Sequence, residues 1–124
     1  MIYGVGIDIV KIDRMREVVE KWGQKFLERV FTKNEISYCY EKKDPSLSLA
    51  VRFAAKEALI KAMGASAPVS LTDIEVVNLE TGKPSLKVNV KLQDFFKEKS
   101  IKCAHLSLSH EHDYGIAFVI LESE

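Results

Sequence analysis

The sequence predicts an α+β domain in which an antiparallel sheet packs against helices. Three observations lead to this fold class: helix-type patterns fill most of residues 13–63, strand-type patterns dominate after residue 73, and a glycine-punctuated strand opens the chain. A chain of 124 residues has room for one hydrophobic core and not for two. We therefore expect residues 1–124 to form a single domain.

The first expected strand covers residues 2–10 and is rich in β-branched residues. Gly4 and Gly6 in this strand permit another backbone to approach closely. Asp8 interrupts the apolar run, and a buried aspartate is costly unless a partner or a metal ion compensates its charge. The plainer interpretation is that Asp8 caps a turn or pairs with an arginine.

Helices are expected over the next fifty residues. A helix over residues 13–22 would have Asp13 as its N-cap and Gly23 as its stop, and a short helix through Val30 would follow. Thr32 and Glu35 match a capping box, so a helix should run from there to about residue 40. The strongest helical pattern covers residues 47–63, with a serine at 46 or 48 as its cap and Gly64 at its end.

The second half is expected to form strands around one short helix. After a connection at residues 65–70, strands at 73–79 and 84–90 would be joined by a turn containing Gly82. A short helix at 92–99 precedes a hairpin of residues 106–110 and 115–121. Because residues 115–121 are apolar throughout, this last strand is predicted to be buried on both faces.

Composition excludes several classes of protein. The formal net charge is +0, so the molecule lacks the overall basic field that nucleic-acid binding usually needs. The longest apolar run, residues 115–121, is far shorter than the ~20 residues of a membrane span. The N-terminus has an acid where a signal peptide needs its apolar stretch, which predicts a cytoplasmic protein. Cys39 and Cys103 are interpreted as reduced, structural thiols.

The helix at 47–63 carries the charges of greatest interest. Glu57 and Lys61 lie four residues apart on one face, and Arg52 and Lys56 form a second such pair on a neighbouring stripe. The plain interpretation is a solvated face with one ion pair. Alternatively, a carboxylate beside cations can hold Mg²⁺ and a phosphate together, with Asp8 as the second acid. Spacing alone does not bring Asp8 to Glu57.

Other candidates are weaker. His110 ends a strand with period-two alternation and is either a hydrogen-bonded residue or a phosphate contact. His105, His110 and His112 could form a transition-metal cluster, but no cysteine is evident to support it. The turn of Gly82, Lys83 and Pro84 is either a plain hairpin turn or a phosphate contact.

Taken together, these segments resemble one family. The segments are GIDIV at residues 6–10 with Arg14 after it, RFAAKEALIKAMG at 52–64, DIEV at 73–76, GKP at 82–84, and LSLSHE at 106–111 followed by Tyr114 and AFV at 117–119. This order resembles the holo-[acyl-carrier-protein] synthases, the short single-lobe type of the 4′-phosphopantetheinyl transferase superfamily. The resemblance covers nearly the whole chain and implies that superfamily's fold.

The resemblance also implies an activity and its residues. The expected reaction moves 4′-phosphopantetheine from coenzyme A to a serine of acyl carrier protein and releases adenosine 3′,5′-bisphosphate, in support of fatty acid biosynthesis. Asp8 and Glu57 match magnesium ligands and, with Lys61, the catalytic set. Arg52, Lys61 and His110 match positions facing the coenzyme A phosphates, with the turn at 82–84 as a further substrate contact, and Arg14 matches the helix that docks the carrier protein.

Members of that family are homotrimers with active sites at subunit interfaces, which would let Asp8 and Glu57 meet between chains. The proton acceptor stays open between Glu57 and, less directly, Glu35. One alternative function is a coenzyme A or nucleotide-binding module without catalysis. Another is an interaction domain in which Asp8, Glu57 and Lys61 form ordinary ion pairs.

Overall fold

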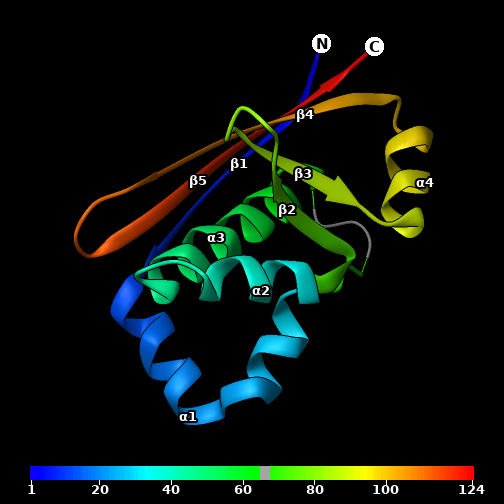
Figure 1. Cartoon of the computed structure of the whole chain (residues 1–124). Helices are drawn as coiled ribbons and strands as arrows, with labels where there is room; N and C mark the ends of the chain where they lie inside the picture. Colours follow the sequence, from blue (N-terminus) through cyan, green and yellow to red (C-terminus); the bar gives the residue numbers. More distant parts are fainter. Residues whose placement is uncertain (65–67) are drawn as a thin grey trace.

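The computed structural model describes residues 1–64 and 68–124 (Figure 1). Part of the connection expected at 65–70, namely residues 65–67, lies outside the described residues. Along the described chain, the elements are β1 (Ile2–Lys11), α1 (Ile12–Val30), α2 (Lys33–Tyr40), α3 (Pro45–Met63), a 3₁₀ turn (Leu71–Asp73), β2 (Ile74–Asn78), β3 (Pro84–Val88), α4 (Val90–Glu98), β4 (Ile101–His110) and β5 (Tyr114–Ser123). The α+β class with antiparallel sheets packed against helices is confirmed.

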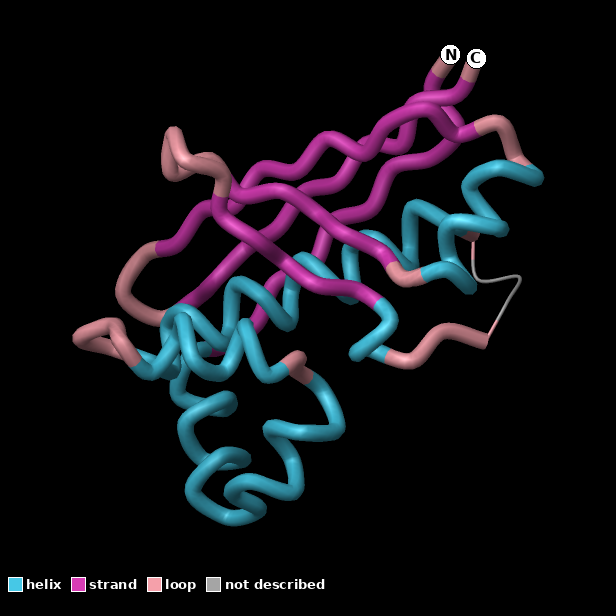
Figure 2. The backbone as a smooth tube through the Cα atoms, turned by 45° about the vertical axis from the view of Figure 1, so that its right-hand side comes forward, coloured by secondary structure: helices cyan, strands magenta, loops and turns pink. Residues whose placement is uncertain are grey.

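The main sheet has the strand order β1-β5-β4, with both pairings antiparallel. Helix α3 lies along one face of this sheet, which we call the inner face, and the two termini lie side by side at one end (Figures 1 and 2). Strands β2 and β3 form a separate antiparallel pair. Among the described residues, no helix has both the length and the apolar composition needed to cross a bilayer.

Glycine in β1 sets the distance between the sheet and α3. A Cβ at Gly4 would overlap the carbonyl oxygen of Ala62, and a Cβ at Gly6 would overlap that of Ala58. Gly4 and Gly6, two residues apart on β1, therefore face Ala62 and Ala58, four residues apart on α3. This backbone-to-backbone contact is the close approach that the sequence predicted.

Two predicted helix starts are wrong. Helix α1 begins at Ile12, its N-cap position is Lys11, and Asp13 lies inside its first turn. Helix α3 begins at Pro45, and the side chain that caps it is Asp44, which accepts from the backbone N–H of Leu47, rather than a serine. In both cases the chain enters the helix one or two residues earlier than the apolar pattern indicates.

The structure confirms the predicted helix stops and the predicted capping box. Gly23 interrupts α1 with φ 57°, so the expected stop appears as a kink between two helical segments. The capping box of Thr32 and Glu35 is present at the start of α2. Gly64 ends α3 in the left-handed region at φ 83°, where a residue without a Cβ is favoured.

The outer face of the main sheet, opposite α3, is apolar but open. Ile7 and Ile9 of β1 are each 59% exposed, and Phe118 of β5 is 39% exposed. The prediction that the last strand is buried on both faces is therefore wrong for the single chain. The residues of β5 that point to the inner face, among them Val119, are buried. Those that point to the outer face are apolar like a buried strand, but no other element of the described chain covers them.

A buried ion pair joins α2 to α3. The Lys56 ammonium lies 2.6 Å from Glu35 Oε1, and both side chains are fully buried. The same ammonium donates to the carbonyl oxygens of Val30 at 2.7 Å and Leu71 at 3.0 Å. Glu35 also accepts from the backbone N–H of Val76 through Oε2 at 2.8 Å. The interpretation of Lys56 as part of a solvated face is wrong, and Glu35 is a structural group rather than an accessible base.

Candidate active site

Asp8 is placed by the close packing of β1 on α3. It follows Gly4 and Gly6 at the same two-residue interval, so its side chain lies on the inner face of the sheet, opposite Ala117 of β5. Because β1 is at the edge of the sheet, this position borders solvent, and the Asp8 side chain is 17% exposed. The Asp8 carboxyl group therefore faces α3 while keeping contact with solvent.

The face of α3 next to Asp8 carries Glu57 and Lys61. The Lys61 ammonium donates to Asp8 Oδ1 and to the carbonyl oxygen of Ile7, each at 3.0 Å. The Lys61 side chain is 55% exposed, so it can swing toward a ligand at little cost. Asp8 and Glu57 line one cleft of about 500 Å³ between β1, α1 and α3. The structure thus brings the three predicted catalytic residues together.

The carboxylates of Asp8 and Glu57 repel each other electrostatically. Partial burial raises the pKa of Glu57 above its usual value, the negative charge of Asp8 raises it further, and Lys61 opposes the change. A cation between two such acids would remove their repulsion. Mg²⁺ prefers oxygen donors and commonly takes one or two carboxylates, leaving its other positions to water and substrate phosphates. The donor set of Asp8 and Glu57 fits that ion.

One expectation about these acids is wrong. The resemblance implies that a trimer would let them meet between chains, but a single chain already brings both to the same cleft. The sequence does not reveal this, because residues 8 and 57 are joined only by the packing of β1 on α3, which depends on the glycine and alanine contacts.

Arg14 also lines this cleft, from the first turns of α1, together with Lys11 and with apolar side chains such as Phe53. Arg16, on the same helix, is engaged differently: it pairs with Asp13 and Asp44. The predicted partner-binding residue is therefore beside the predicted catalytic residues.

Arg52 lies away from the cleft. Its guanidinium stacks over the Tyr38 ring at 4.3 Å and donates to Asn78 Oδ1 at 2.7 Å, and the residue is only 4% exposed. Asn78 in turn donates to the carbonyl oxygen of Gly82 at 3.1 Å, which supports the turn that continues to Lys83 and Pro84. Arg52 and residues 82–84 thus form a second group, and their contact with coenzyme A stays a prediction.

His110 occupies a third place. It ends β4 and borders a hollow with Ile12, Asp44 and Leu47, near the start of α3. Within one chain, the predicted coenzyme A contacts therefore lie outside the Asp8–Glu57 cleft. These contacts are Arg52, Gly82–Pro84 and His110. Tyr38 and Asn78, which hold Arg52, were not predicted from the sequence; the signal for Asn78 is a polar residue that closes a strand directly before a turn.

Comparisons with known proteins identify the family of this chain. The family model of the 4′-phosphopantetheinyl transferase superfamily matches residues 4–119. The holo-[acyl-carrier-protein] synthase of Halothermothrix orenii is 46% identical, over 98% of each chain. The structure of the holo-[acyl-carrier-protein] synthase from Neisseria meningitidis superposes with a TM-score of 0.92 at 37% identity, covering 99% of this chain and 100% of that one.

A further solved structure is that of the Helicobacter pylori holo-[acyl-carrier-protein] synthase in complex with coenzyme A. It has a TM-score of 0.84 at 33% identity and covers 95% of this chain and 99% of that one. Full-length similarity to synthases places this chain in the 4′-phosphopantetheinyl transferase superfamily, among proteins similar to the holo-[acyl-carrier-protein] synthases.

Proposed function

We propose that this chain transfers 4′-phosphopantetheine from coenzyme A to a serine of acyl carrier protein, releasing adenosine 3′,5′-bisphosphate. The observation that carries the proposal is the cleft lined by Asp8 and Glu57, with the Lys61 ammonium hydrogen-bonded to Asp8 at its side. The similar Helicobacter pylori synthase, whose structure holds coenzyme A, indicates the donor. Because the relatives are named as synthases, a module that binds coenzyme A without catalysis is the less favoured function.

The residues of the cleft suit phosphoryl transfer, in which positioning and charge neutralisation are the main demands on a protein. The serine hydroxyl of the carrier attacks the β-phosphate of coenzyme A, and the adenosine bisphosphate leaves. Glu57 is proposed to accept the serine proton, because it lines the cleft beside Asp8. Lys61 turns from Asp8 to a non-bridging phosphate oxygen.

We assign the magnesium site to Asp8 and Glu57, on the basis of their oxygen donors and their mutual repulsion. When bound, the ion would neutralise charge on the pyrophosphate of the donor.

The active assembly is proposed to be a homotrimer in the cytoplasm. The open apolar face with Ile7, Ile9 and Phe118 supports association with copies of this chain, because contiguous exposed apolar surface usually marks an interface. A second observation also supports association between chains. The predicted phosphate contacts lie outside the Asp8–Glu57 cleft of their own chain, namely Arg52, residues 82–84 and His110. Contact between copies would let one chain supply phosphate contacts to the cleft of the next.

Arg14 is proposed to dock the carrier protein. It lines the cleft from α1, in a region where residues 11–33 hold seven basic and four acidic side chains. Arg14→Ala should raise the KM for an acidic carrier without changing that for coenzyme A. Arg16→Ala is the matched control because its exposed ion pairs contribute little. Equal effects of the two substitutions on the carrier KM would contradict the assignment.

The function is tested by incubating the protein with coenzyme A, Mg²⁺ and apo acyl carrier protein and measuring the carrier's mass. Wild-type protein should add the mass of the phosphopantetheine arm, and Asp8→Asn and Glu57→Ala should abolish the addition. Glu98→Gln, an exposed acid on α4, is the control and should act like wild type. No mass increase with wild-type protein would refute the function, and full activity of either active-site variant would refute the residue assignment.

A further inference from the structure

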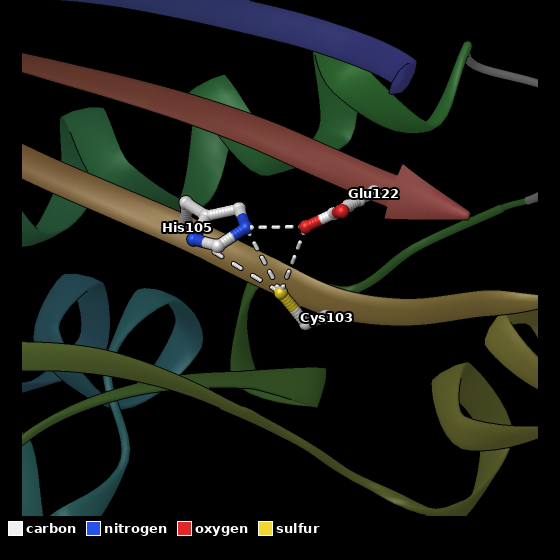
Figure 3. A group of neighbouring side chains, drawn as sticks. All are labelled: Cys103, His105 and Glu122. Atoms are coloured by element: carbon white, nitrogen blue, oxygen red, sulfur yellow. Dashed lines mark hydrogen bonds and ion pairs between the residues drawn. The ribbon is translucent and has the colours of Figure 1, made fainter. Parts of the chain in front are cut away.

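Three different metal-binding side chains converge on the outer face of the main sheet, at the end where the chain termini lie. Cys103 and His105 extend from β4 and Glu122 from β5, and Figure 3 shows all three pointing toward one another. His105 Nε2 lies 3.0 Å from Cys103 Sγ and 2.9 Å from Glu122 Oε1, and the sulfur lies 3.7 Å from the same carboxylate oxygen. One donor atom from each residue therefore faces a common point.

The register of the sheet produces this grouping. Ile101 pairs with Ser123 and Cys103 with Glu122, so the ladder contains an irregularity at Lys102. Such a bulge changes which face the following side chains occupy. It places Cys103 directly opposite Glu122, and His105, two residues further on, shares their face.

The contacts do not suit a cysteine–histidine–carboxylate relay. A relay needs one imidazole nitrogen for the thiol and the other for the carboxylate. Here Nε2 makes the short contact with both Cys103 and Glu122, and Nδ1 is 4.0 Å from the sulfur. The Cys103 thiol instead donates to Glu122 Oε1 at 3.7 Å, so the thiol and the imidazole both turn to one carboxylate oxygen, and the three donor atoms surround a point that a cation would occupy.

The spacing is close to that of a zinc centre. Zinc bonds of about 2.0–2.3 Å in a tetrahedron separate the donor atoms by about 3.3–3.6 Å. The observed separations of 2.9, 3.0 and 3.7 Å need shifts of up to about half an ångström. The His105 side chain is 56% exposed, so such shifts meet little resistance.

The charges also balance. A zinc-bound cysteine is a thiolate, and with the Glu122 carboxylate it cancels the two positive charges of the ion. Lys102, whose ammonium is 3.5 Å from the other carboxylate oxygen, therefore faces a neutral centre rather than a cation.

We propose that Cys103, His105 and Glu122 bind one zinc ion per chain, with an open fourth position toward solvent. The site is separate from the Asp8–Glu57 cleft, which offers oxygen donors alone. It also lies away from the middle of the outer apolar face, because Glu122 is four residues beyond Phe118, about 13 Å along the strand at about 3.3 Å per residue. The thiol and imidazole donors select zinc-like ions over magnesium.

A cluster of His105, His110 and His112 is poorly supported by the sequence, in which no cysteine stands close to all three. The structure supplies that cysteine but joins it to His105 alone of the three histidines, and the third donor comes from β5. His110 lies at the far end of β4, beside the hairpin.

The proposal is tested on the full chain, in the assembly in which it purifies, by titration with Zn²⁺ in competition with a chromogenic chelator. We expect one ion per chain in the presence of excess Mg²⁺. Cys103→Ser, His105→Gln and Glu122→Gln should each weaken binding by at least about tenfold, since even outer-shell partners of metal sites contribute about 10- to 100-fold. His112→Gln is the matched control and should bind like wild type.

Replacement of zinc by Co²⁺ provides a second measurement that identifies the ligand. Wild type should show thiolate-to-cobalt charge-transfer absorption, and Cys103→Ser should lose it. Cys39 will not substitute, because burial raises the pKa of its thiol to about 11. The proposal is overturned if wild type binds no zinc, if Cys103→Ser binds zinc as wild type does, or if binding is lost in Glu57→Ala but kept in the three cluster variants.

Discussion

Replacing Lys56 by methionine tests whether the buried ion pair holds the helices in place. The substitution keeps the length of the side chain and removes an ammonium that donates to Glu35, Val30 and Leu71 at 2.6, 2.7 and 3.0 Å. Glu35 would then be left as a fully buried carboxylate without a cation. Removing one partner of a buried pair typically destabilises a protein by about 3–5 kcal/mol, and we expect a loss in that range.

The measurement is urea unfolding followed by circular dichroism at one fixed chain concentration. The midpoint should fall while the slope of free energy against urea stays constant. Lys61→Met is the matched control on the same helix: its half-exposed ion pair with Asp8 is worth about 0–1 kcal/mol. A loss below about 1 kcal/mol for Lys56→Met, or equal losses for the two variants, would refute the reasoning.

A second substitution at the partner separates charge from packing. Glu35→Gln added to Lys56→Met removes the uncompensated charge and keeps one amide oxygen, which replaces one of the two carboxylate oxygens that accept from the N–H groups of Thr32 and Val76. The double variant should therefore be more stable than Lys56→Met alone. If it is less stable, the lysine acts through packing rather than through its charge.

Three further substitutions test the packing of β1, the acid pair and the open sheet face. Gly6→Ala places a Cβ 2.8 Å from the carbonyl carbon of Ala58. This overpacking against backbone should lower the free energy of unfolding by about 1–3 kcal/mol and reduce transfer activity. Unchanged urea unfolding would contradict the close contact. Glu57→Gln should abolish transfer yet stabilise the metal-free protein above the normal glutamate pKa. The sign follows from the raised pKa of Glu57, because the folded state favours the protonated acid. The contribution of Glu57 to stability therefore declines as pH rises through the raised pKa. The urea midpoint of the wild type should fall over this pH range, and the midpoint of the variant should fall less. Ile7→Arg should dissociate the assembly in light scattering, whereas Val90→Arg, on exposed α4, should not; an unchanged mass for Ile7→Arg would exclude the outer face as the interface.

The sequence alone determined the features that depend on a few neighbouring residues. The capping box at Thr32, the left-handed stop at Gly64 and the turn at Gly82 were all predictable because each satisfies backbone groups or torsion angles within one turn of chain. The glycine spacing of β1 predicted a close backbone approach. The order of motifs predicted the family, and the comparisons confirm it.

The tertiary structure decided which charges of α3 are buried and which face the cleft. Arg52, Lys56, Glu57 and Lys61 occupy one alanine-rich helix with weak amphipathic character, so the apolar pattern does not identify a solvent side. The partners that select among them come from other elements: Glu35 and Tyr38 from α2, Asn78 from β2 and Asp8 from β1.

The cluster of Cys103, His105 and Glu122 shows the same limit of local information. Its donors come from two strands, and a one-residue irregularity at Lys102 sets the register that makes them neighbours. Periodicity within a strand tells which residues share a face, but the partner across the ladder depends on how two distant segments align. Sequence therefore fixed the chemical groups available to this protein, and packing between elements decided which of those groups meet.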